Sequence, residues 1–96
     1  MTDYLTRIEK TVQENVAAGE VTILGVVAIE RMTVEREGYW ERAYYVAWQN
    51  EREAGTHQVN INSKDEAALF YGHYQLTPTD AIHDMIERAG LTAGRI

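Results

Sequence analysis

The side chains best suited to chemistry in this sequence are its three histidines. His57, His73 and His83 are separated by fifteen and nine intervening residues. A zinc site built within one element uses short spacings such as His-x3-His, and the chain has no cysteine to add thiolate ligands. We therefore expect no metal and no cofactor, and in particular no metal ion on His73 or His83.

General acid or base chemistry is the other use for these groups. His73 lies in the aromatic segment 70–74, FYGHY. A small-ligand protein or enzyme would need a pocket, and one hypothesis places it near His73, Tyr71 and Tyr74. The only serine, Ser63, stands three residues before Glu66 and fits a helix capping box. No catalytic residue is assigned, and we expect that the protein is not an enzyme.

The surroundings of the histidines favour structural roles. His73 is expected to be partly buried against the aromatic residues of its own segment. His57 opens a short strand beside a turn and is expected in solvent. His83 falls on the polar flank of the last predicted helix.

The charge balance argues against nucleic-acid binding. The net charge is −6, and the nine Lys and Arg residues are scattered singly, whereas a nucleic-acid-binding protein must neutralise phosphates. The acidic surplus could instead imitate nucleic acid for a basic partner, or it could keep the protein soluble. The Glu-Arg-Glu triplets 35–37 and 51–53 fall at opposite ends of the predicted sheet, so we expect no continuous acidic face.

Length and hydropathy predict one cytoplasmic domain, residues 1–96. Hydrophobic residues make up 45% of the 96 residues and charged residues 25%, as in ordinary globular proteins. The longest apolar run, VTILGVVAI, is far shorter than a membrane span, and no secretory signal is recognised. We expect no membrane association and a reducing compartment.

The first half of the chain predicts a helix followed by strands. Residues 2–18 carry apolar side chains at helical spacing and end at a glycine. Residues 21–37 are rich in β-branched side chains and predict a long strand, with a bulge near Glu30 where the alternation shifts phase. A second strand is expected over 39–51 and a third over 57–63.

The second half predicts two helices. The capping box starts a helix over 64–74, with apolar side chains on one face. Thr77 caps a second helix with Pro78 at its first position and Gly90 after its end, and 91–96 is expected to be a loose tail. The predicted fold is α+β, a three-stranded antiparallel β-meander packed with one N-terminal helix and two C-terminal helices, in the order α-β-β-β-α-α.

The two longer strands are apolar on both faces. Either helices cover both faces of the sheet, or one face carries an open patch that marks an interface. Tyr and Arg are enriched at interface hot spots, and a homodimer supplies a complementary surface through symmetry. The candidate interface residues are Tyr39, Arg42, Tyr45 and Ala47.

The element order α-β-β-β-α resembles that of double-stranded-RNA-binding domains. Their basic cluster at the last helix is replaced here by SKDEAAL or TPTDAIHD, so RNA binding is not implied. The fuller order in a small acidic chain is similar to some phage-encoded anti-CRISPR inhibitors. We therefore expect a non-enzymatic protein-binding module of the phage accessory or inhibitor type, with a protein partner or a second copy. The alternative is an acidic nucleic-acid mimic.

Overall fold

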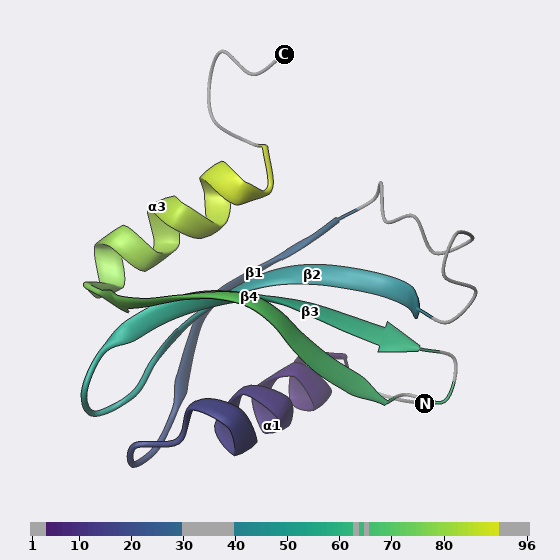
Figure 1. Cartoon of the computed structure of the whole chain (residues 1–96), viewed down its shortest axis with the longest axis horizontal. Coiled ribbons are helices and arrows are strands. Elements are labelled where there is room, and N and C mark those ends of the chain that lie inside the picture. The colour runs from purple at the N-terminus through teal and green to yellow at the C-terminus, as the bar shows by residue number, and fades with distance from the viewer. Residues whose placement is uncertain (1–3, 30–39, 63, 65, 91–96) are drawn as a thin grey trace.

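The computed structural model describes residues 4–29, 40–62, 64 and 66–90. The elements are α1 (Tyr4–Val16), β1 (Thr22–Ala28), β2 (Trp40–Gln49), β3 (Ala54–Asn62), β4 (Ala67–Leu76) and α3 (Pro78–Arg88). The strands form one antiparallel sheet in the order β1-β2-β3-β4, and α1 and α3 lie on its opposite faces (Figure 1). The α+β class and the antiparallel sheet are confirmed. The predicted number of strands was wrong, because there are four in the described chain.

The predicted helix over 64–74 was wrong, because this segment forms β4. Asn62 turns the chain after β3: its side-chain oxygen accepts the backbone N–H groups of Lys64 and Glu66, and its amide nitrogen donates to the Glu66 carboxylate. An Asx-type turn therefore uses Glu66, which was expected to cap a helix. Pairing with the backbone of β3 then outweighs the helical spacing of the apolar residues.

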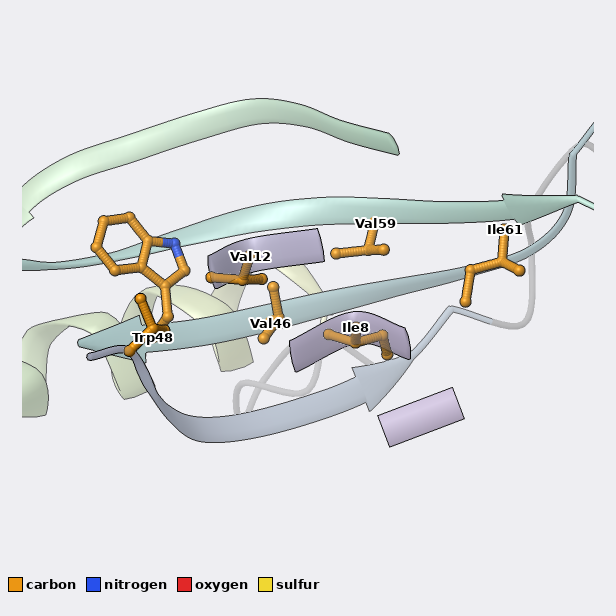
Figure 2. Close-up of a cluster of buried hydrophobic side chains, with 7 residues drawn as sticks. Ile8, Val12, Val46, Trp48, Val59 and Ile61 are labelled. Carbon is orange, nitrogen blue, oxygen red and sulfur yellow. The ribbon is translucent and has the colours of Figure 1, made fainter. Parts of the chain in front are cut away.

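Helices cover both faces of the sheet, which explains why the two longer strands are apolar on both sides. Val46, Trp48, Val59 and Ile61 lie on the face that packs against Ile8 and Val12 of α1 (Figure 2). The opposite face buries a smaller cluster against α3, made by Ala47, Ala54, Ala81 and Met85. Of the two alternatives drawn from the strands, the covered sheet is the one observed.

The residues predicted to end the first helix and to begin the last one have the expected conformations. Gly19 has φ 77°, a conformation that favours glycine, and it follows α1. The Thr77 side chain accepts the backbone N–H of Asp80 at 3.0 Å, and Pro78 is the first residue of α3, as predicted. None of the described helices is long and apolar enough to cross a membrane.

Three predictions concern residues that the structure does not describe. The expected bulge near Glu30, the triplet 35–37 and the tail 91–96 lie outside the described residues. Within β1, the pairing shifts register between Ile23 and Gly25. The observed order α-β-β-β-β-α has one more strand than the order on which the resemblances to other proteins were based.

Candidate functional site

Strand β4 is an edge strand with two bulges. Its residues advance by three, from Phe70 to His73 and from His73 to Leu76, while the partner residues on β3 advance by two. Tyr71 and Gln75, one in each bulge, have positive φ angles of 53° and 62°. Bulges bend a strand and re-aim its side chains, and they are common beside functional sites.

The backbone of β4 is strained at these positions. The left-handed region costs residues other than glycine on the order of 1–3 kcal/mol each. Burial does not offset this strain at Tyr71, because its side chain is 73% exposed. The bulge that contains Tyr71 therefore holds the tyrosine ring in water, and it lowers the stability of the fold.

A buried hydrogen-bonded relay orients the hydroxyl of Tyr74. The indole N–H of Trp48 donates to Nδ1 of His57 at 3.0 Å, and Nε2 of His57 lies 2.9 Å from the Tyr74 hydroxyl. Because an indole only donates, Nδ1 must accept, and a neutral His57 carries its proton on Nε2. His57 then donates to the Tyr74 oxygen. The Tyr74 O–H is left to donate outward, from a side chain that is 51% exposed.

The His57 ring is held neutral. Burial, together with the positive charges of Arg88 and His73, lowers the pKa of His57 from 6.5 to about 4. The proton that a charged ring would carry on Nδ1 would also displace the bond from Trp48.

This shift predicts a loss of stability in weak acid. The unfolded chain takes up a proton at His57 near pH 6.5, and the folded chain does so only near pH 4. The contribution of the neutral His57 ring to the free energy of unfolding is therefore fully present above pH 6.5. It is lost as the pH falls from 6.5 to 4, by at most about 3 kcal/mol. Urea unfolding at a series of pH values measures it. His57→Gln should remove most of this fall and the exposed-residue control His83→Gln should retain it; identical profiles for wild type and His57→Gln would contradict the assignment.

A second polar network lies on the α3 side of β4. Nδ1 of His73 is 2.8 Å from Oδ2 of Asp84, and the Thr56 hydroxyl donates to the same oxygen at 2.5 Å. Arg88 donates to the Thr56 oxygen at 2.9 Å and lies over the Tyr45 ring, 4.9 Å from its centroid. Burial alone would raise the pKa of Asp84. The hydrogen bonds from Thr56 and His73 and the charges of His73 and Arg88 outweigh it, so the pKa falls below 3.8.

The second bulge is tied to the turn between β2 and β3. The Glu53 carboxylate accepts the backbone N–H of Gln75 at 2.6 Å. A pocket of about 530 Å³ opens there, lined by Arg52, Glu53, Gln75 and Leu76. It is polar and shallow, with two opposite charges on its walls, and it lies beside the bulge that carries Gln75.

The predicted interface residues do not come together. Tyr39 lies outside the described residues. Arg42 is exposed and stacks over Tyr4 of α1, 4.5 Å from the ring centroid. Tyr45 packs in the cluster beneath α3, and Ala47 in that cluster has no exposed surface. No open patch on this face joins Tyr45 and Ala47 in the described chain.

Two of the three expectations for the histidines were wrong. His57 is only 4% exposed, although it was expected in solvent. Its position was readable, because His57 alternates in phase with the apolar residues Val59 and Ile61 of the same strand. His73 was expected to be partly buried on a helix but lies on the strand edge with half of its side chain exposed. His83 is exposed, as predicted.

Metal binding stays a separate prediction. Over the described residues, no group of three or more metal-ligating side chains occurs. We expect zinc titration of the wild type to give no stoichiometric binding. Tight uptake that is lost in His73→Ala would contradict this expectation.

Comparisons of the chain with protein-family models, with curated proteins and with solved structures found no match.

Proposed function

We propose that this protein is a non-enzymatic, cytoplasmic protein-binding module whose contact surface is the outer edge of β4. This β4 edge surface consists of Tyr71, His73, Tyr74 and Gln75, all of them exposed. The observation that carries the proposal is the strained presentation of Tyr71. Strained backbone residues cluster at functional sites, so a strained residue that exposes an aromatic ring to water indicates that the ring contacts a partner.

The composition of the surface fits a protein partner. Tyrosine is enriched among residues that dominate binding energy, because it buries a large rigid ring and keeps a polar end. Tyr71 and Tyr74 are exposed tyrosine side chains, at 73% and 51%. Ordering them in advance of binding reduces the entropy lost on association.

The relay defines what the partner must offer. Because His57 donates a hydrogen bond to the Tyr74 oxygen, the Tyr74 O–H can donate to an acceptor on the partner, such as a backbone carbonyl or a carboxylate. The bulges interrupt the regular backbone ladder of the edge, so a partner strand cannot simply extend the sheet. Contact is therefore made by side chains, with an apolar surface against Tyr71 and an acceptor at Tyr74.

A comparison of variants in binding tests the proposal. A second copy of the chain is the first partner to examine, by light scattering at increasing concentration, and affinity capture with mass spectrometry covers other proteins. Tyr71→Ala and Tyr74→Ala are expected to abolish the complex found with the wild type, while circular dichroism stays unchanged. Thr79→Ala, an exposed change on α3, is the matched control. A complex that survives both tyrosine variants would contradict the proposal.

The His73–Asp84 pair is the observation that favours a second candidate, a ligand-binding or catalytic site. If the neutral His73 ring donates its Nδ1–H to the carboxylate, Nε2 is the basic nitrogen of a half-exposed side chain. The nearby Thr56 hydroxyl is buried and already makes two hydrogen bonds, so it offers no nucleophile. A turnover reaction that is lost in His73→Ala and retained in Thr79→Ala would favour the enzyme over the binding module.

A further inference from the structure

A second surface lies at the opposite edge of the sheet, between α1 and the segment that enters β1. This α1–β1 groove has a volume of about 410 Å³ and is lined by Leu5, Glu9, Glu20, Val21, Thr22 and Ile23. Strands β1 and β4 are the two outer strands of the sheet (Figure 1). The groove is therefore separate from the β4 edge surface.

Three of the residues that line the groove are apolar. Val21 is buried at 4% exposure, and Ile23 packs against the larger core cluster. Leu5 is 60% exposed, and it is the one exposed large aliphatic side chain of the described chain. It sits beside the groove, so an occupant that covered it would remove its apolar surface from water.

The walls of the groove carry negative charge. Glu9 comes from α1 and Glu20 from the segment before β1, and both are exposed. Among the described residues, no Lys or Arg lines the groove. Over the described residues, neither glutamate forms an ion pair with a basic side chain. An occupant with a positive charge complements these walls.

The backbone beside the groove belongs to an edge strand. Within the described chain, β1 pairs with β2 alone, so its other side has no strand partner. An extended peptide can add to such an edge by main-chain hydrogen bonds, while its alternate side chains enter neighbouring pockets.

We propose that the α1–β1 groove binds an extended segment of a partner protein in which apolar residues alternate with Lys or Arg. The apolar side chains contact Leu5, Val21 and Ile23. The basic side chains between them leave the other side of the segment, and their long flexible stems reach back to Glu9 and Glu20 at the rim of the groove. This second contact goes beyond the β4 edge surface and does not depend on it.

Two synthetic peptides of matched length test the proposal, one alternating Val with Lys and the other alternating Val with Glu, both with blocked termini. Titration of isotope-labelled protein followed by amide NMR shifts is expected to move Leu5, Glu9 and residues 20–23 with the Val-Lys peptide. Added salt should weaken this binding. The double variant Glu9→Gln/Glu20→Gln is expected to bind about tenfold more weakly, since each exposed charge pair contributes modestly.

Matched controls separate the groove from the rest of the surface. Glu14→Gln removes an exposed acid of α1 that does not line the groove, and it should leave binding unchanged. Leu5→Ser should weaken binding without loss of the folded state. Tyr71→Ala should have no effect, so a failure of the β4 edge proposal leaves this result intact.

Three results would overturn the inference. They are the absence of shifts at the groove with the Val-Lys peptide, equal binding of the Val-Glu peptide, and shifts at these residues that depend on protein concentration alone. The last would assign the groove to a second copy of the chain.

Discussion

Replacing Gly55 with alanine is expected to lower the free energy of unfolding by about 3 kcal/mol, the upper part of the range for overpacking a core. Gly55 is buried in β3, and a Cβ added there would collide with the carbonyl oxygen of His73 and lie 2.5 Å from Cζ2 of Trp48. Neither neighbour can move aside, because one is backbone of β4 and the other is a fully buried indole. Urea unfolding followed by circular dichroism measures the loss.

Gly25→Ala is the matched control within the same sheet. A Cβ at Gly25 would meet only the tip of Met85, with Cε at 2.9 Å and Sδ at 3.4 Å. A methionine side chain is flexible and can adapt, so the expected loss is below about 1 kcal/mol. Equal losses for the two variants would show that β4 and Trp48 yield to Gly55 more easily than their packing indicates.

The parts of the fold that sequence predicts well are those specified by local signals. The cap at Thr77 followed by Pro78 places the start of α3 at the predicted residue. Gly19, with its positive φ, follows α1 as expected. In β2, the alternation of side chains correctly separates Val46 and Trp48 from Ala47, because each set meets a different helix.

The segment that became β4 could not be placed by local signals. Its apolar residues recur at helical spacing, and the two bulges disturb the alternation that would mark a strand. What decides its structure is pairing with the edge of β3, and the paired residues Ala54 and Leu76 are 22 positions apart in the sequence. Such non-local pairing is invisible to a window of sequence. The missed fourth strand and the misplaced His73 are the same error.

The candidate site was only partly readable for the same reason. The segment 70–74 was recognised as rich in aromatic residues, and one hypothesis placed a ligand pocket near His73, which stays a prediction. The sequence does not indicate the positive φ of Tyr71. Glycine is the residue expected at a positive φ, and here the glycine is the next residue, Gly72. The hydrogen bonds among Trp48, His57 and Tyr74 join three strands, so the spacing of these residues along the chain does not predict them.

Tyr71→Ala and Tyr71→Gly are expected to differ in stability while sharing the same loss of binding. Both remove the exposed ring, and as a hot-spot residue Tyr71 should contribute at least about 2 kcal/mol, or roughly thirtyfold in affinity. Only glycine relieves the positive φ of 53°. The glycine variant should therefore be more stable than the alanine variant by about 1 kcal/mol, as measured by urea unfolding.

Ala68→Gly supplies the comparison in the same strand, at a position without a positive φ. There glycine should be less stable than alanine by about 0.5–1 kcal/mol, because it loses more conformational freedom on folding. The opposite sign at the two positions isolates the strain at Tyr71 from the general effect of glycine. If Tyr71→Gly is the less stable variant, the bulge carries no strain and the main support for the β4 edge surface is lost. If it is the more stable variant and still binds the partner, the strain exists but does not serve binding. Only greater stability together with lost binding shows that the fold gives up stability at Tyr71 to present its ring to a partner.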